Sequence, residues 1–439
     1  IDEVHNLENR VRSSYTQDMF YKKMKKEADA AKQINRSIGE PLDKSLKEYH
    51  EYIEQVFNSL QGQISRQDKK AKKEDREIER YSVCPEKIEG LKGICQCLHD
   101  INFYASMDFG LNDYARNRDY SREIEALEEQ ERFFQSLNAE DSEDIFWMTV
   151  KGKGHNGICL SSCPKEVDKL TNKLLFQSMR FSTILTSATI TSGNSEKYLQ
   201  NYRYFIRNIN FPYKAGVISE PKQSPFDYDK HAMIYYTEGM PHPSRQRKRF
   251  IAAGVAEIIR LITLTEGKTL ILFTAKADMK EVYQLLKGRI PYKILMQKDG
   301  DSQKEILDQF KSNVNSVLLG TGSYWEGISV EGMTLSSVII FKLPFPVPEP
   351  IIDYKCGMSG DKSLMEVLVP EMVIKLKQGI GRLIRNQSDR GIVTIIDSRV
   401  GEQSKAPYKQ LIWDSLPIKN RTNDFSKIDE FYNSIVLEK

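Results

Sequence analysis

The chain has 439 residues, of which 40% are hydrophobic and 28% charged, and its formal net charge is +3. This length and composition predict two or three globular domains, each with its own core, and the mild charge does not by itself indicate a polyanionic partner. Apolar runs such as Thr269 to Phe273 are too short to span a bilayer, and the residues after Ile1 are no signal peptide. These features exclude a membrane-spanning protein, and we expect a cytoplasmic one with no membrane partner.

Six cysteines stand at positions 84, 95, 97, 159, 163 and 356. Their spacings match neither a paired C-x-x-C zinc site nor the dense pattern of a secreted disulfide protein. We therefore expect reduced thiols. A metal site built from Cys84, Cys95 and Cys97, or from Cys159 and Cys163, is the alternative.

The chain opens on an acidic box, in which Asp2 and Glu3 are followed by His5. In a P-loop motor such a box ends a core strand, where the first carboxylate holds Mg²⁺ and the second activates the attacking water. The other half of such a site is a glycine-rich loop with a lysine. No such loop precedes Ile1, so we expect the chain alone not to hydrolyse ATP. An exposed acidic turn with a hydrogen-bonded histidine is the alternative.

Residues 11–174 predict a mainly helical insertion. Apolar residues recur at three- and four-residue steps, with few Gly or Pro, over residues 15–34, 46–64 and 120–137. Lysine-rich runs lie at residues 22–26 and 69–73. A solvated helix face explains these runs about as well as a nucleic-acid path does, so both interpretations stay open.

From about residue 175 the sequence predicts alternating strands and helices. Short runs rich in Val, Ile or Leu predict buried parallel strands at Thr183 to Leu185, Thr269 to Phe273, Ser316 to Leu319, Val338 to Phe341 and Ile392 to Ile396. Helical patterns predict crossover helices at Arg249 to Leu264, Ala277 to Leu286 and Gln303 to Phe310. Residues 224–227 are typical of a hinge between two such units.

A second box, residues 185–189, follows the first of these strands and contains Thr186, Ser187 and Thr189. Small hydroxyl side chains after a buried strand can relay hydrogen bonds between a nucleotide and another ligand. Taken alone, the box is better interpreted as a plain turn.

A third box, residues 320–329, also follows a strand and is rich in glycine. Its glycines, Gly327 among them, let the backbone approach a phosphate or a base, and Ser323 can bond a phosphate oxygen. Trp325 offers a rigid face that either packs internally or lies against a nucleotide, and internal packing is the favoured alternative.

A fourth box contains Gln378, Gly381, Arg382 and Arg385 on a predicted helix. This spacing places them along one helical side, where two guanidinium groups can face a triphosphate across a cleft. An arginine finger needs that arrangement. Two surface arginines on a solvated helix are the alternative.

The order and spacing of these boxes resemble the XPD/DinG-like branch of superfamily 2 helicases. Residues 2–5 look like motif II, 186–189 like motif III, 272–275 like motif IV, 320–329 like motif V and 378–385 like motif VI. Two Pro-Phe segments, residues 224–228 and 343–348, look more like DinG than XPD. Val4 stands where the family commonly has alanine, and Ser329 stands where an aspartate often sits.

The resemblance implies an α/β fold with two RecA-like parallel-sheet motor domains, the first incomplete, and a mainly helical Arch-like insertion. Residues 1–10 would end the motif II strand of the first motor domain, and residues 11–174 would form the insertion. The chain would return to the first motor domain at 175–226, and 227–439 would form the second.

The implied activity is that of an ATP-dependent DNA helicase, which moves 5′ to 3′ along single-stranded DNA, unwinds forked duplexes and serves DNA repair. Asp2 would coordinate Mg²⁺ bound with ATP, and Glu3 would be the base for hydrolysis. His5 would link this site to the neighbouring motif. Arg382 and Arg385 would reach the γ-phosphate from the second motor domain.

The same resemblance assigns the remaining boxes. Gln378 and Gly327 would bind the nucleotide, and the residues implied in coupling or nucleic-acid contact are Thr186, Ser187, Thr274, Ser323, Trp325 and Glu326. The iron–sulfur cysteines of this branch lie upstream of motif II, so a cluster is possible only on an upstream segment. The implied protein is a monomer, associated with the nucleoid in a prokaryote.

Two alternatives stay open at this point. The chain could be a fragment that binds single-stranded nucleic acid without hydrolysing ATP, or it could be the motor part of a helicase–nuclease. RNA as the substrate is less expected on family grounds, although contacts to a sugar-phosphate track do not exclude it.

Overall fold

The computed structural model describes residues 1–34, 38–73, 77–107, 121–177, 182–193, 195–222, 224–298, 300–327, 330 and 334–437. Two compact units divide the chain. The first takes Ile1–His5, Met179–Pro346 and Ser359–Lys439, and the second takes Asn6–Ser178 and Val347–Met358. In the part of the chain that the structure describes, no helix combines the length and apolar character needed to cross a membrane.

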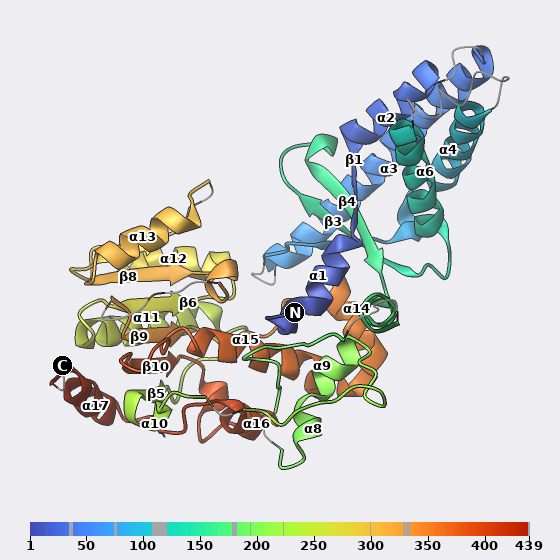
Figure 1. The fold of residues 1–439 in the computed structure, drawn as a ribbon. Coiled ribbons are helices and arrows are strands. Elements are labelled where there is room, and N and C mark those ends of the chain that lie inside the picture. Colours follow the sequence, from blue (N-terminus) through green and yellow to red (C-terminus); the bar gives the residue numbers. More distant parts are fainter. Residues whose placement is uncertain are drawn as a thin grey trace. The chain divides into compact units, whose positions relative to one another are not determined.

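A parallel sheet forms the centre of the first unit (Figure 1). In the described residues it has seven strands, in the order β11-β5-β10-β9-β6-β8-β7, and each pairing is parallel. The strands are β5 Ala232–Tyr236, β6 Thr269–Leu272, β7 Lys293–Met296, β8 Ser316–Gly320, β9 Ser337–Ile340, β10 Gly391–Ile395 and β11 Arg421–Thr422. This sheet confirms the predicted α/β class.

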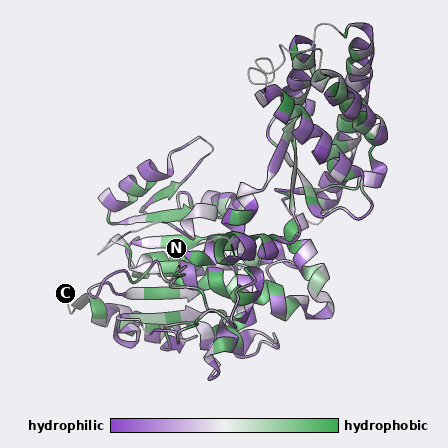
Figure 2. Ribbon diagram, turned by 45° about the vertical axis from the view of Figure 1, so that its right-hand side comes forward, coloured by the Kyte–Doolittle hydropathy of each residue, from purple (hydrophilic) through white to green (hydrophobic). Residues whose placement is uncertain are grey.

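The environment of β6 explains why the sequences of these strands are apolar at every position. Leu270 and Leu272 join the core on one face of the sheet, whereas Ile271 joins the core on the other face. Successive side chains of a strand point to opposite faces, so a strand covered on both sides needs apolar residues at every position. Figure 2 shows the strands of this sheet as green, hydrophobic segments.

Helices cover both faces of the sheet. The core on one face receives side chains from α13 Gln303–Ser312, α15 Val369–Ile380 and α16 Lys409–Ser415. The core on the other face receives side chains from α11 Arg247–Leu264, α12 Lys276–Leu286 and α17 Phe425–Leu437. The unit also contains the short helices α8 Tyr198–Asn201, α9 Arg203–Asn208 and α10 Tyr228–His231.

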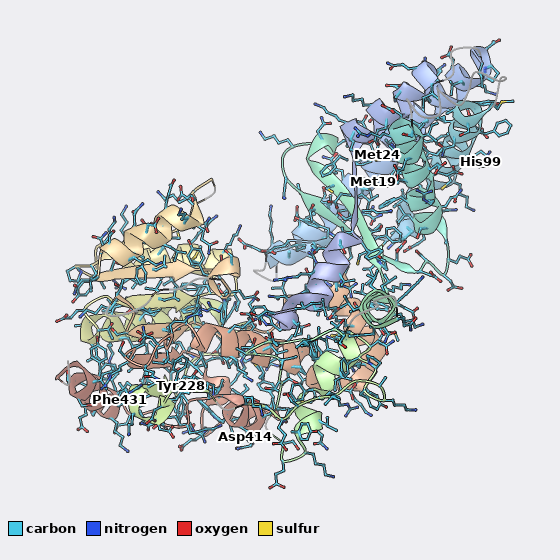
Figure 3. All side chains as sticks on the ribbon, viewed as in Figure 1. Met19, Met24, His99, Tyr228, Asp414 and Phe431 are labelled. Atoms are coloured by element: carbon cyan, nitrogen blue, oxygen red, sulfur yellow. The ribbon has the colours of Figure 1, made fainter. Side chains whose placement is uncertain are left out.

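The second unit combines helices with a small antiparallel sheet of order β1-β4-β3-β2. Its strands are β1 Gln17–Phe20, β2 Tyr81–Ser82, β3 Asp144–Val150 and β4 Ile158–Pro164. Its helices are α1 Leu7–Ser14, α2 Tyr21–Ile34, α3 Glu40–Lys73, α4 Leu91–Ser106, α6 Ser121–Asn138, α7 Val167–Asn172 and α14 Pro350–Ser359. Met19 of β1 and Met24 of α2, both labelled in Figure 3, belong to the core that the helices and this sheet share.

The structure corrects the predicted elements at several places. The predicted helix over residues 15–34 is wrong at its start, because β1 occupies Gln17–Phe20 and only α2 is helical. The insertion therefore contains a sheet that the sequence did not indicate. In the first unit the predicted strands at β6, β8, β9 and β10 are confirmed, whereas β5, β7 and β11 were missed.

Gly379 of α15 is required by the packing of Trp325. A Cβ atom at this position would lie 2.8 and 2.9 Å from two carbon atoms of the buried Trp325 ring. We therefore expect Gly379→Ala to lower the free energy of unfolding by about 1–3 kcal/mol, because the added methyl group overpacks the core. The measurement is urea denaturation followed by tryptophan fluorescence.

Gly357→Ala in α14 is the matched control. A Cβ atom at Gly357 would meet no atom within 4 Å, and alanine is the better helix former. The control should leave the urea midpoint unchanged or raise it. A Gly379→Ala variant as stable as the control would contradict this account of the packing.

Candidate functional site

Residues 1–4 are joined by backbone hydrogen bonds to the segment that carries the second box. The Ile1 nitrogen donates to the Ile184 carbonyl over 2.7 Å, and the Thr186 N–H donates to the Ile1 carbonyl over 3.0 Å. The Val4 N–H donates to the Thr186 carbonyl over 3.1 Å. The regular strand predicted at residues 183–185 is wrong, because a ladder needs bonds repeated along several residues, and these bonds are isolated.

Asp2 is held as a carboxylate by its neighbours. The Thr186 hydroxyl donates to Oδ1 over 2.8 Å, and the Glu3 N–H donates to the same oxygen over 2.9 Å. These bonds, the Thr186 bond first, lower the pKa of Asp2 from its ordinary value, since they stabilise the charged form. The side chain is exposed and ionised, so it is available to a cation.

Glu3 has a strained backbone. Its φ is +53°, in the left-handed region that residues other than glycine seldom adopt. Its Oε2 atom lies 3.3 Å from His5 Nδ1 and accepts a hydrogen bond from the Ser187 hydroxyl over 3.4 Å. Such conformations persist where the surroundings hold them, and they concentrate at functional sites.

His5 connects the first box to the second. Its side chain is only 6% exposed. Nδ1 lies 2.8 Å from the Ser187 hydroxyl and 3.3 Å from the Thr189 hydroxyl, and the tautomer of the ring decides which atom donates. Residues that the chain separates by more than 180 positions thus form one hydrogen-bonded cluster.

The fourth box begins on a helix but does not stay on it. α15 ends at Ile380, so the prediction that the whole box lies along one helical side is wrong beyond that residue. The Gly381 N–H donates to the Lys377 carbonyl over 2.9 Å, which closes the helix. The Asp389 carboxylate then accepts from the Arg385 N–H over 2.8 Å. This acceptor competes with the helical hydrogen-bond pattern and fixes a turn instead.

Charged residues from three of the boxes influence the pKa of Arg382. Burial and the positive charge of Arg385 lower the pKa of Arg382 to about 10, whereas the charges of Glu3 and Glu326 oppose that shift. Its Nε also donates to the carbonyl of buried Gln378 over 3.1 Å. The Arg382 guanidinium group therefore interacts electrostatically with charges from the first, third and fourth boxes.

The Trp325 side chain packs inside the first unit. Its ring is fully buried, and Nε1 donates to the Phe273 carbonyl over 2.8 Å. The prediction that Trp325 contacts nucleic acid or a nucleotide is therefore wrong, and the internal packing that the sequence favoured is what the structure has. The buried indole holds the third box against the end of β6.

Three further predicted residues, Thr274, Ser323 and Gly327, follow β6 or β8 along the chain. Gly327 is exposed, with a φ of +74° that suits glycine. Thr274 follows β6, and Ser323 follows the neighbouring strand β8 and donates to Gln303 over 2.9 Å. Since parallel strands end at one edge of a sheet, Thr274 and Ser323 share that edge. Ser329 lies outside the described residues.

Asp2 suits a magnesium ion that is bound together with a nucleotide. Mg²⁺ in nucleotide sites is held by one or two carboxylates plus the phosphates of the substrate. Among the residues that the structure describes, no group of three or more His, Cys, Asp or Glu is arranged to hold a metal ion. The Asp2 carboxylate is a donor of the kind that such a nucleotide-bound metal ion uses.

Sequence reasoning missed Lys377, which lies directly before Gln378 on α15. Its Nζ donates to the carbonyl of Thr191 over 3.1 Å and to the hydroxyl of the same residue over 2.9 Å. A single lysine within a helical pattern gives no signal of how far its side chain is buried. Its adjacency to the fourth box was the one available clue.

A family model for a helicase C-terminal domain matches residues 258–418. The chain is 35% identical to the ATP-dependent DNA helicase YoaA of Escherichia coli over 256 residues, which cover 57% of this chain and 38% of that protein. It is 29% identical to the 3′-5′ exonuclease DinG of Bacillus subtilis over 314 residues, which cover 68% of this chain and 32% of that protein.

Among solved structures, S. tokodaii Xpd4 matches with a TM-score of 0.51 at 16% identity, over 92% of this chain and 72% of that one. The sequence similarity of this chain is thus to a helicase C-terminal domain and to the YoaA and DinG proteins. The Xpd4 match shows the fold. The chain spans 38% and 32% of the two curated relatives.

The hydrogen bond from Thr186 to Asp2 can be tested directly. We expect Thr186→Val to raise the pKa of the Asp2 carboxyl group, because the variant loses the donor that contributes most to stabilising the carboxylate. Asp2 would then take up its proton at a higher pH than in the original chain. The measurement is an NMR titration of the Asp2 carboxyl carbon.

Thr189→Val is the matched control, since the Thr189 hydroxyl contacts His5 rather than Asp2. This variant should leave the Asp2 titration in place. An unchanged Asp2 titration in Thr186→Val would contradict the role assigned to the bond.

Proposed function

We propose that this chain forms part of the motor of an ATP-dependent DNA helicase. The observation that carries the proposal is the hydrogen-bonded cluster that joins the acidic box to Thr186 and Ser187, together with the charge of Glu3, which acts on Arg382. A carboxylate that can activate water and arginines that can neutralise a triphosphate are the two protein groups that ATP hydrolysis requires beside a phosphate-binding loop. The curated relative from Escherichia coli, an ATP-dependent DNA helicase, supports the same activity.

The proposal assigns the parts of the chain to domains. Residues 1–10 and 175–226 belong to the first motor domain, and residues 227–439 form the second. Residues 11–174 form an Arch-like insertion. The parallel sheet with helices on both faces supports the second assignment, since RecA-like motor domains have that architecture.

Within the nucleotide site each group has one task. Asp2 holds the Mg²⁺ that accompanies ATP, and Glu3 accepts the proton of the attacking water. Arg382 and Arg385 stabilise the charge that develops on the γ-phosphate, while Gln378 positions Arg382 through its carbonyl. The mutual repulsion of the two arginines favours this task, because an anion near both relieves it.

The nucleic-acid track lies at the edge where β6 and β8 end. Thr274 and Ser323 lie at this edge, and Thr186 and Ser187 connect the acidic box to the segment that follows it. We propose single-stranded and forked duplex DNA as the ligands, with movement 5′ to 3′. The name of the YoaA relative supports DNA, and the direction rests on family resemblance alone.

A helicase–nuclease is the second candidate. The relative from Bacillus subtilis is named a 3′-5′ exonuclease, and this chain covers 32% of it. The motor would then serve degradation, with the nuclease chemistry on another part of the full-length protein. Release of nucleotides from single-stranded DNA by that protein, dependent on a segment outside this chain, would favour it.

Glu3→Gln tests the proposed function. We expect ATP turnover of the full-length protein to fall by roughly 10²- to 10⁴-fold, because the variant removes the base. Binding of ATP and of single-stranded DNA should stay within about twofold, since the metal ligand and the track are intact. The measurement is steady-state phosphate release, with fluorescence binding assays alongside.

Glu305→Gln is the control, because Glu305 is exposed on α13 and belongs to none of the boxes. Near-normal turnover in Glu3→Gln would sink the assignment of the acidic box. Loss of turnover in both variants would indicate that removing any negative charge lowers activity, and would not support a specific role for Glu3.

A further inference from the structure

The ammonium group of Lys377 is partly removed from water and is hydrogen-bonded to neutral oxygens, which is unusual for a lysine on a helix. Lys377 lies one residue before Gln378 on α15, and it is partly buried. Its ammonium group donates to two oxygens of a single residue, the Thr191 carbonyl over 3.1 Å and the Thr191 hydroxyl over 2.9 Å. Burial, and then the charge of Lys419, lower the pKa of Lys377 to about 8.

This arrangement stabilises the fold poorly. Removing an ammonium group from water is costly unless an opposite charge and good hydrogen bonds offset it. Within the described ranges no carboxylate forms an ion pair with Lys377, and Thr191 offers only neutral oxygens. A methionine of similar length would fill the space without that cost. Groups whose pKa is strongly perturbed by burial cluster at functional sites.

The hydrogen bonds between Lys377 and Thr191 join two residues that each lie within two positions of a box. Thr191 lies two residues after Thr189, whose hydroxyl is 3.3 Å from His5. Lys377 precedes Gln378, whose carbonyl accepts from Arg382. The Lys377 side chain therefore connects the segment after the second box to the helix whose end carries the arginine pair.

Further contacts join the same two parts of the unit. Arg207 of α9 pairs with the Glu366 carboxylate over 3.1 Å and donates to its carbonyl over 2.8 Å, and the Tyr204 hydroxyl donates to Glu371. Glu366 lies in a π-helical turn, Leu364–Leu368, directly before α15. Such turns are rare and are frequent at functional sites. The Arg207 side chain is 44% exposed, and exposed pairs contribute little to stability.

We propose that Lys377 is a positioning residue, which through Thr191 couples the acidic box and the second box to the arginine pair at the end of α15. The inference rests on the proposed function. It adds a role for a residue outside the boxes: the lysine sets how Arg382 and Arg385 approach the nucleotide, without touching it.

The test uses Lys377→Met, Thr191→Val and the double variant in the full-length protein. We expect Lys377→Met to lower kcat for DNA-stimulated ATP hydrolysis about tenfold, with KM for ATP and the affinity for single-stranded DNA within about twofold. Thr191→Val loses only the hydroxyl bond and should lower kcat about threefold. The double variant should be no slower than Lys377→Met, because both changes remove one interaction.

Two further variants separate positioning from folding. Lys377→Arg, which keeps a cationic donor, should recover most of the lost turnover. Lys311→Met on α13 changes an exposed lysine and should keep full turnover. Lys377→Met should unfold at the same urea concentration as the original protein, or at a higher one. A lowered urea midpoint, with activity lost only in proportion to unfolded protein, would overturn the inference in favour of a structural role.

The outcomes separate the two proposals. If Glu3→Gln abolishes turnover while Lys377→Met keeps normal kcat, the inference on Lys377 is wrong and the proposed function stands. If losses in Lys377→Met and Thr191→Val multiply in the double variant, the residues act independently and the inference is also overturned. If the original full-length protein hydrolyses no ATP, the proposed function fails and the inference fails with it.

Discussion

The candidate site depends on the backbone pairing between residues 1–4 and the segment around Thr186. Without these bonds Asp2 would lose the hydroxyl that stabilises its carboxylate, and His5 would lose Ser187. Val4 is 1% exposed, so its burial anchors the pairing from within the unit. Two short segments, separated by more than 180 residues, thus obtain a fixed geometry that neither has alone.

The second half of the site follows from how α15 ends. Gly379 gives room to the Trp325 ring, α15 ends at Ile380, and the Asp389 carboxylate fixes the turn that follows at Arg385. Both arginines then lie close to one turn, where burial and the charge of Arg385 lower the pKa of Arg382. The oxygens of a bound phosphate would stabilise the charged form of Arg382 in these surroundings.

The sequence predicted the strands that appear in it as continuous apolar runs. Strands such as β6, buried on both faces, were evident, but β7 and β11 lie at the edges of the sheet, where burial demands less of the sequence. β1 buries only Met19 and was taken for helix. The box residues were identifiable from type and spacing, whereas the positive φ of Glu3, the end of α15 and the burial of Lys377 come from tertiary contacts that a local pattern does not encode.

The central claim is that the acidic box and the arginine pair act on one nucleotide. A double-mutant cycle of Glu3→Gln and Arg385→Ala, measured as kcat for ATP hydrolysis by the full-length protein, tests it most directly. The account predicts that the double variant is no slower than the slower single variant, since groups serving one transition state are not additive. Losses that multiply, or an Arg385→Ala variant that keeps its kcat and loses only affinity for DNA, would contradict it.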